Sequence, residues 1–309
     1  MQDLPKYVLI TPARNEAQYI EATIKSVLAQ SARPVRWVIV SDGSTDGTDE
    51  IVMRYARQHE WIELIRMPER TERHFAGKVL AFKTGETRVA DLSYAVIANL
   101  DADITFRDDY FSFLLSSLGA NPKLGVVGTP YMETSGESYD YSFTSRDHVS
   151  GACQVFRREC FEAIGGYSPI KIGAIDCIAV ISARMKGWET RTFTEHVCYH
   201  HRRTGTAEQS IWKAGIATGA MDHTMGNHPL WQFFRVIYQT SRRPYVLRGL
   251  AVGLGYLGAT IRREPRPVTR EFVTFHRGEQ ILRLKQKFGI RADSAGSNLV
   301  APRGIRQVR

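Results

Sequence analysis

The sequence is short of cysteine, and the few cysteines that it has are scattered. Four of the 309 residues are cysteine, and none stands in a Cys-x-x-Cys pair: Cys153, Cys160, Cys177 and Cys198. This pattern excludes a zinc cage and the disulfide framework of a secreted domain, and it predicts a reducing cytosol. The first residues also lack a basic segment followed by a long apolar core, so no signal peptide is expected.

Acidic residues are scarce in one part of the chain only. From His228 to Arg309 there are 16 Lys and Arg against 4 Asp and Glu, whereas residues 1–227 carry 25 against 28. The net charge of +9 therefore comes from the C-terminal part. A nucleic-acid enzyme would carry positive charge around its site. We therefore expect an anionic membrane surface, and no nucleic acid, as the partner of this tail.

The first half alternates β-rich runs with helical patterns. The expected strands cover residues 7–13, 35–44, 61–67 and 94–103, and the expected helices cover residues 15–30, 44–59, 76–89 and 108–118. Such alternation predicts an α/β fold with a mainly parallel, doubly wound, Rossmann-like sheet. Ligands of such sheets bind at the carboxyl ends of the strands, and the polar motifs stand at those ends.

The alternation loosens after Asn121, and a helical pattern returns over residues 174–190. We expect a first domain at residues 1–227, with halves at about 1–120 and 121–227. A basic, aromatic-rich helical extension follows at residues 228–309, with a disordered end after Ile290.

A buried strand is expected to end in two carboxylates, Asp101 and Asp103. Charged acids are rarely buried unless they are paired or hold a metal. Two hard oxygen ligands at this spacing suit Mg²⁺ or Mn²⁺, whose remaining positions can take diphosphate oxygens. The alternative is a helix N-cap and a solvated loop acid, because this three-residue pattern is common by chance.

Three further motifs stand at fixed places: "TPARNE" (Thr11–Glu16) after the first strand, "SDGSTDGT" (Ser41–Thr48) after the second, and "FAGKVLAFKTG" (Phe75–Gly85) at the third helix. In this order and spacing, with the Asp101–Asp103 pair, residues 6–205 resemble the family-2 glycosyltransferases of the GT-A fold. The resemblance implies an inverting, metal-dependent enzyme that uses a nucleotide-sugar donor with Mg²⁺ or Mn²⁺.

The resemblance also implies roles in the donor half. The residues that match the loop along the nucleoside are Thr11, Pro12, Arg14 and Glu16. Asp42 matches the acid that accepts a hydrogen bond from the base, usually uracil, and Lys78 matches a basic residue near the phosphates. The plainer alternatives are a turn and helix cap by Ser44 and Thr45, and a solvated lysine.

The second half must supply the acceptor site and a base. In inverting members of the family a carboxylate takes the proton from the acceptor hydroxyl, and the matching position is Asp176 in "GAIDCIAV". The sequence departs from the family pattern here, because Ile175 stands where a Glu is commonest. The alternative for Asp176 is an N-cap of the following helix.

The segment "CYHHRRTG" (Cys198–Gly205) comes next. The resemblance implies that His200 or His201 completes the metal shell beside Asp101 and Asp103, and that Arg202 and Arg203 contact phosphate. The residues alone do not choose between the two histidines, although we favour His200. The QxxRW motif of processive synthases is absent, which favours transfer of a single sugar.

The uncharged run between Arg248 and Arg262 is shorter than the roughly 20 residues of a spanning helix. We therefore expect interfacial helices on an anionic leaflet rather than a span. The alternative is that these helices pack on the first domain or on a second subunit.

The expected function is transfer of one sugar to a lipid-linked or surface-glycan acceptor, and the resemblance implies a UDP-sugar as the donor. The expected place is the cytoplasmic face of a bacterial inner membrane, and an oligomer is left open. The alternatives are a sugar nucleotidyltransferase, which would carry a Gly-rich loop after the first strand, and a non-catalytic membrane-bound scaffold. "TPARNEAQYI" is poor in glycine, and the acids of the motifs are intact.

Overall fold

The computed structural model describes residues 4–69, 75–133, 145–171, 173–202, 210–243 and 245–289. The chain divides into two compact units: Met1–Ala183 with Trp188–Glu208, and Arg184–Gly187 with Gln209–Arg309. The second unit thus takes in residues 209–227, which the sequence prediction assigned to the first domain. The expected disordered end after Ile290 lies outside the described residues.

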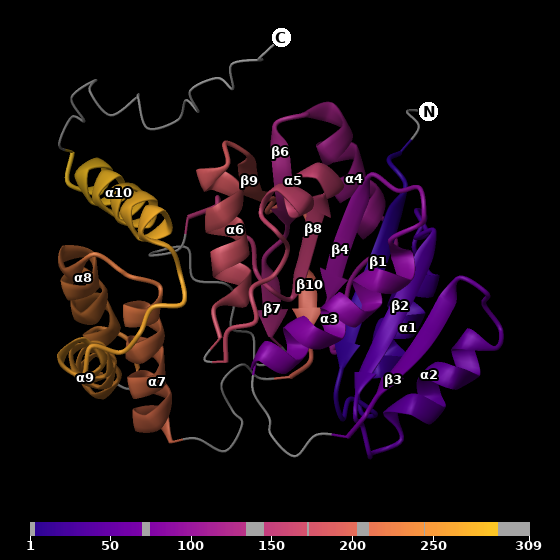
Figure 1. The fold of residues 1–309 in the computed structure, drawn as a ribbon, viewed down its shortest axis with the longest axis horizontal. Helices are drawn as coiled ribbons and strands as arrows, with labels where there is room; N and C mark the ends of the chain where they lie inside the picture. Colours follow the sequence, from indigo (N-terminus) through magenta and orange to yellow (C-terminus); the bar gives the residue numbers. More distant parts are fainter. Residues whose placement is uncertain are drawn as a thin grey trace, which may run out of the picture. The chain divides into compact units, whose positions relative to one another are not determined.

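A seven-stranded sheet forms the centre of the first unit, in the order β3-β2-β1-β4-β8-β6-β9 (Figure 1). Its strands are β1 (Tyr7–Ala13), β2 (Arg36–Asp42), β3 (Ile62–Met67), β4 (Val96–Leu100), β6 (Leu124–Gly128), β8 (Cys153–Arg157) and β9 (Glu189–Thr192). The pairs β1–β2, β1–β4, β2–β3 and β6–β9 are parallel, while β8 runs antiparallel to both of its neighbours. The predicted mainly parallel α/β sheet is confirmed.

Helices connect these strands and cover the sheet. They are α1 (Ile20–Leu28), α2 (Thr48–Ala56), α3 (Phe75–Val89), α4 (Tyr110–Ala120), α5 (Arg158–Ala163) and α6 (Ile175–Met185). The centre of the sheet is apolar on both faces, as parallel sheets require: the successive residues Leu9 and Ile10 of β1, and Ile39 and Val40 of β2, are all fully buried. At Gly85 a Cβ would lie 2.6 Å from Cγ2 of Ile10, so glycine lets α3 approach the sheet closely.

A second sheet of three short strands brings distant segments together. It has the order β5-β10-β7, formed by β5 (Ile104–Thr105), β10 (Cys198–His200) and β7 (Tyr131–Glu133). His200 pairs with Ile104 across the antiparallel β10–β5 ladder. The segment after β4 is therefore held beside the segment "CYHHRR".

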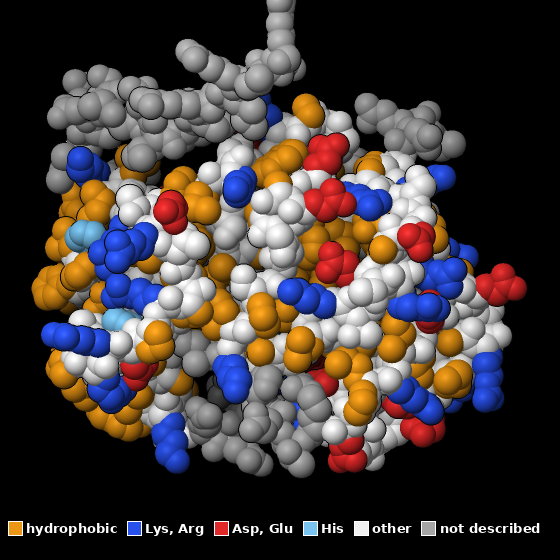
Figure 2. All heavy atoms as spheres, viewed as in Figure 1, with side chains coloured by type: hydrophobic (Ala, Val, Ile, Leu, Met, Phe, Trp, Pro, Cys, Tyr) orange, Lys and Arg blue, Asp and Glu red, His pale blue; other side chains and the backbone are white. Residues whose placement is uncertain are grey.

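The second unit contains four helices within its described residues: α7 (Ile211–Thr224), α8 (Pro229–Thr240), α9 (Leu247–Ile261) and α10 (Arg270–Lys287). Helix α7 packs on α9 through glycines. A Cβ on Gly219 would lie 2.0 Å from the Val252 carbonyl oxygen, and one on Gly255 would lie 2.1 Å from that of Ile216. This packing explains why α7 belongs to the second unit. Hydrophobic side chains are exposed over α8 and α9 (Figure 2).

The predicted helical extension is confirmed. Within the described residues, each helix is too short or too polar to cross a membrane.

Candidate active site

The loops after β1 and β2 are joined by hydrogen bonds. Asn15 has a positive φ of 57°, its N–H donates to Ser44 Oγ (3.1 Å), and its Oδ1 accepts from the Thr45 amide (2.9 Å). The N–H of Glu16 donates to Thr48 Oγ1 at 2.8 Å. Because these residues are committed to a loop, α1 begins later than the sequence pattern predicts.

The start of α2 differs from the expected cap. Its N-cap is Gly47, with a φ of 91°, rather than Ser44 or Thr45. The Asp46 carboxylate takes the place of the expected Ser44 or Thr45 hydroxyl. Its Oδ1 accepts a hydrogen bond from the Thr48 amide at 3.1 Å, and its Oδ2 accepts one from the Ala17 amide at 3.0 Å. Ser44 and Thr45 serve the contact with Asn15 instead.

Asp42 lies at the end of β2, buried, with one carboxylate oxygen 3.9 Å from the Arg14 guanidinium. The following Gly43 has a φ of 67°, and a Cβ there would lie 2.6 Å from the Glu69 backbone. Glycine is therefore required to turn the chain past β3. Arg14 and Asp42 form one group at the carboxyl edge of the sheet.

Thr11 and Pro12 belong to the same strand end, but they differ in exposure. The Thr11 side chain is fully buried, and its hydroxyl accepts a hydrogen bond from Trp37 Nε1 at 3.0 Å. Pro12 is partly exposed. The Thr11 hydroxyl is thus part of the core, whereas Pro12, Arg14 and Glu16 are partly exposed.

Asp101 follows β4 directly, and Lys78 of α3 forms an ion pair with it. The Asp101 side chain is 28% exposed. Burial raises the pKa of Asp101, and the attraction of Lys78 only partly offsets it. The pKa of Lys78 is raised as well, because Asp101 outweighs the effect of burial. Lys78 is therefore a cation held at the Asp101–Asp103 pair, and the alternative of a plain solvated lysine is not what the structure shows.

Asp103 is buried among basic groups. Its Oδ2 lies 3.3 Å from His200 Nε2 and 3.4 Å from Arg202 Nε. Burial would raise the pKa of Asp103, but the hydrogen bond from His200 and the positive charges of His200, Arg202 and Lys78 together outweigh it, and the pKa is lowered. In turn Asp103 raises the pKa of His200 against the effect of burial. Arg202 also forms an ion pair with Glu16, which links this group to the loop after β1.

The two histidines of the "CYHHRR" segment have different neighbours. His200 faces Asp103, whereas His201 Nε2 lies 2.8 Å from Thr105 Oγ1 and the His201 amide donates to the Asp103 carbonyl at 3.0 Å. Successive side chains of a strand point to opposite sides, which explains why His200 faces Asp103 and His201 does not. Arg203 lies outside the described residues.

Asp101, Asp103 and His200 are the predicted metal ligands, and two of them converge. The 3.3 Å between Asp103 Oδ2 and His200 Nε2 brings together a carboxylate and an imidazole, both of which Mn²⁺ accepts. Asp101 is directed at Lys78 instead. Within the described residues, three potential ligand atoms lie within 4.8 Å of one another at His148, Asp176 and Cys177, rather than at the predicted set. Asp103 and His200 therefore fit a divalent cation as a pair.

Asp176 lies in the first turn of α6, after Ala174, which has a φ of 60°. Its Oδ2 accepts a hydrogen bond from the Gly151 amide at 3.1 Å. A Cβ on Gly151 would lie 2.9 Å from this oxygen, so only glycine allows the approach. The Asp176 carboxylate accepts its hydrogen bond from a neighbouring loop and not from the first turn of α6, so Asp176 is not the N-cap of this helix.

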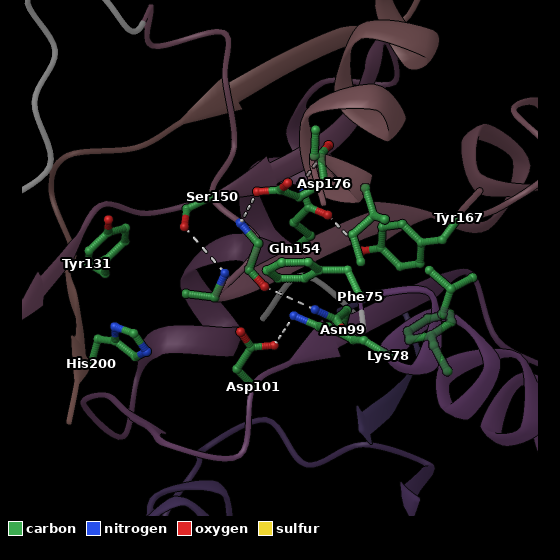
Figure 3. Close-up of a pocket in the computed structure, with 16 residues that line it drawn as sticks. Phe75, Lys78, Asn99, Asp101, Tyr131, Ser150, Gln154, Tyr167, Asp176 and His200 are labelled. Atoms are coloured by element: carbon green, nitrogen blue, oxygen red, sulfur yellow. Dashed lines mark hydrogen bonds and ion pairs between the residues drawn. The ribbon is translucent and has the colours of Figure 1, made fainter. Parts of the chain in front are cut away.

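Four of these groups line one cavity of about 280 Å³ (Figure 3), whereas Asp42, Asp103 and Arg202 are not among the residues that line it. Lys78 comes from α3, Asp101 from the end of β4, Asp176 from α6 and His200 from β10, and all four line it. Apolar walls are provided by side chains such as Phe75 and Tyr167. An apolar cavity with a few convergent polar and charged groups is the usual form of a small-molecule site.

Sequence reasoning missed several polar residues of this cavity. Asn99 is buried in β4; its Nδ2 donates to the Gly151 carbonyl at 3.1 Å, while its Oδ1 has no partner within the described residues. Gln154 accepts from the Tyr167 hydroxyl at 2.7 Å. The signal that could have revealed Asn99 is its amide side chain inside the apolar strand "VIANL". Buried polar groups normally form hydrogen bonds, so an amide in a buried strand indicates a specific partner or ligand.

The family model described as Glycosyl transferase family 2 matches residues 8–173, more than half of the chain. The chain belongs to glycosyl transferase family 2. The matched segment of this family-2 protein contains Asp42, Lys78, Asp101 and Asp103, and it ends before Asp176.

Curated relatives cover a smaller part of this family-2 protein. A poly-beta-1,6-N-acetyl-D-glucosamine synthase of Staphylococcus epidermidis is 31% identical over 121 residues, which are 38% of this chain and 26% of the synthase. The synthase of Staphylococcus aureus (strain COL) is 28% identical over 131 residues, 42% of this chain and 30% of its own length. The chain thus matches less than a third of each of these relatives.

Two solved structures resemble the whole chain. A mannosyltransferase of Pyrobaculum calidifontis, in complex with GDP-Man and Mn²⁺, has a TM-score of 0.55 at 18% identity, covering 97% of this chain and 86% of that one. S. aureus TarS, in complex with UDP-GlcNAc, has a TM-score of 0.51 at 14% identity, covering 92% and 83%. The predicted GT-A fold of the family-2 protein is confirmed.

Proposed function

We propose that this protein transfers a single sugar from a nucleotide-diphosphate sugar, a UDP-sugar, to an acceptor hydroxyl with inversion at the anomeric carbon. One observation carries the proposal: Asp176 lines the same cavity as the Lys78–Asp101 ion pair (Figure 3). Asp176 as a base and Lys78 as a cation for the diphosphate can therefore act on one nucleotide sugar bound in this cavity.

Asp176 is the base in this proposal. It takes the proton of the acceptor hydroxyl while that oxygen forms a bond to the anomeric carbon. The bond from that carbon to the diphosphate oxygen breaks on the opposite face, and its electron pair leaves with the nucleoside diphosphate. The hydrogen bond from the Gly151 amide keeps the carboxylate oriented for this role.

Lys78 and Arg202 hold the negative charge of the leaving diphosphate. Both are already held by acids of the site, Asp101 and Glu16 respectively, so their ammonium and guanidinium groups are positioned before the donor binds. Asp103 and His200 would hold Mg²⁺ or Mn²⁺. The cation supplies additional charge stabilisation to the departing diphosphate when it is bound.

Asp42 and the loop Pro12–Glu16 bind the nucleoside. A buried carboxylate at a strand end accepts an N–H of the base, which suits uracil. The two similar structures were solved with GDP-Man and UDP-GlcNAc, so both donors belong in the test. The acceptor proposed is lipid-linked or a surface glycan, consistent with a basic C-terminal unit and with the polysaccharide synthases among the relatives.

The test begins with the melting temperature of the full chain in UDP, GDP, UDP-GlcNAc and GDP-Man, with and without Mn²⁺. A ligand that binds only the folded state raises the melting temperature. At a ligand concentration of a hundred times Kd, the free energy of unfolding increases by about 2.7 kcal/mol. We expect a metal-dependent rise with UDP that is lost in Asp42→Ala and in Asp103→Asn.

The second step separates chemistry from binding. Asp176→Asn keeps an acceptor for the Gly151 amide, so it should still be stabilised by UDP while UDP release from the donor falls by about 10²- to 10⁴-fold. The control is Asp91→Asn, at an exposed position outside the cavity. Turnover by Asp176→Asn at the parent rate would contradict the base assignment. If all four nucleotides left the melting temperature unchanged, the scaffold alternative would be favoured.

A further inference from the structure

Helix α9 is apolar on two opposite sides. One side is buried against α7, with Gly255, Val252 and Ala259 in the contact or the core. The other side carries an apolar stripe whose members are between 48% and 79% exposed: Leu247, Leu250, Leu254, Leu257 and Ile261. Their spacing of three and four residues places them on one face. In water alone, this face would be an unusually large exposed apolar surface for a helix.

Helix α8 adds a second exposed row beside α9. Leu230, Phe233 and Ile237 are 47–58% exposed and share a face, while Gln232 on the other side is buried. The two helices touch where Gly249 lies against Val236 and Thr240. Figure 2 shows the hydrophobic side chains gathered over α8 and α9 with basic ones beside them. No acidic residue occurs from Pro229 to Ile261.

Basic and aromatic groups border these rows. In the connection between the helices, the Arg242 guanidinium lies 5.4 Å from the ring centre of Tyr238, and that of Arg243 lies 5.9 Å from that of Tyr245. Such residues extend an apolar body into a membrane while the charge stays with the headgroups. Arg248 lies in the first turn of α9.

A hollow at the other end of α9 is also basic. Arg263, Arg266 and Arg270 line it beside the first turn of α10, where the N-terminal end of the helix adds positive character. Glu264 lies there as well and is paired with Arg262 at 2.9 Å. The stripe therefore ends, just after Ile261, in a group of cations of the kind that phosphate headgroups attract.

We propose that the exposed rows of α8 and α9 dock on the surface of an anionic phospholipid bilayer, with both helices lying in the headgroup region and the arginines contacting lipid phosphates. Charge argues for this occupant over a second copy of the chain. A second copy would present the same arginines and no acid on its own α8 and α9, so like charges would face each other. A bilayer with anionic lipids offers both an apolar interior and the opposite charge.

The experiment measures binding of the full chain to vesicles of phosphatidylcholine alone and of phosphatidylcholine with phosphatidylglycerol, by co-sedimentation. We expect binding to the anionic vesicles that weakens with salt. The double variant Leu250→Glu with Leu254→Glu changes exposed side chains only, and it should lower the partition coefficient by at least about tenfold. The matched control is Leu282→Glu, an equally exposed leucine of α10, which should bind like the parent.

The pair Arg263→Gln with Arg270→Gln tests the basic hollow, and it should weaken binding to anionic vesicles only. The proposal is overturned if the Leu250 and Leu254 variant binds as well as the parent, or if Leu282→Glu loses binding equally. It is also overturned if the parent ignores both kinds of vesicle, and a dimer that the Leu250 and Leu254 variant dissociates would then identify a second copy as the occupant. All these readouts are independent of the proposed sugar transfer.

Discussion

Acid should destabilise the helical unit through His276 of α10. This side chain is buried, and its Nε2 lies 2.9 Å from Asn227 Oδ1. The same Oδ1 accepts from Gln280 Nε2 at 2.9 Å, and the Asn227 Nδ2 donates to Gln232. The amide orientation thus makes Oδ1 an acceptor, so His276 donates its Nε2–H and leaves Nδ1 unprotonated. Nδ1 is buried and has no hydrogen-bond partner within the described residues.

Protonation would place a charge on this nitrogen. Burial is the main reason why the pKa of His276 falls from 6.5 to about 4; Glu279 opposes the shift, and Arg283 and Arg277 add to it. Because the folded pKa lies below the unfolded one, the stabilisation is complete above about pH 6.5 and is lost as the pH falls toward 4. The two pKa values give a loss of about 2 kcal/mol at pH 5 and about 3 kcal/mol below pH 4.

The assay is urea unfolding of the parent and of His276→Gln between pH 8 and pH 5. The free energy of unfolding is plotted against pH for each protein, and the curve of the variant is subtracted from that of the parent. The contributions of groups that titrate in both proteins cancel, so the difference should show the loss of stability that His276 alone causes. His59→Gln, a partly exposed histidine of the other unit, is the control and should keep the parent's slope. An NMR titration of the His276 ring should have a midpoint near the depressed value. Parallel unfolding curves for parent and variant, or a midpoint at the ordinary value of a histidine, would refute the reasoning.

Three further substitutions test helix packing and a hydrogen bond of the core. Gly219→Ala would place its Cβ 2.0 Å from the Val252 carbonyl oxygen, so it should destabilise the protein by about 1–3 kcal/mol in urea unfolding; Gly278→Ala, which meets open space in α10, should instead stabilise it by up to about 1 kcal/mol. Thr11→Val leaves the Trp37 indole N–H without its acceptor, which should lower stability by about 1–3 kcal/mol while the KM for the nucleotide sugar stays unchanged; a raised KM with normal stability would place Thr11 in the nucleotide site.

The α/β half of the fold could be predicted because its signals are local. Strand β1 begins and ends where the pattern placed it, at Tyr7 and Ala13. Helix α1 begins only at Ile20, because Asn15 and Glu16 form hydrogen bonds to the loop after β2. Those partners are distant in the sequence, so a periodicity argument places the start of the helix too early.

The site was predictable in its residue types but not in its pairings. The motifs placed Asp42 and Asp101 at strand ends, where parallel topology collects them, and the family resemblance added Lys78 and Asp176. The structure brings Lys78, Asp101 and Asp176 to one cavity, which Asp42 does not line. The ion pair of Lys78 with Asp101 and the choice of His200 over His201 depend on α3 and on the β10–β5 ladder. Thr11 matched the motif, yet its hydroxyl is occupied by Trp37 in the core.

The sequence by itself determined which segments of the first half form strands and helices, where the acids stand along them, and that the tail is basic, because periodicity, spacing and charge are properties of neighbouring residues. The tertiary structure alone decided which acid meets which cation and which side of α9 is covered. Those outcomes depend on contacts between residues far apart in the chain, and glycines such as Gly151 and Gly219 control them by admitting a second segment where any side chain would collide.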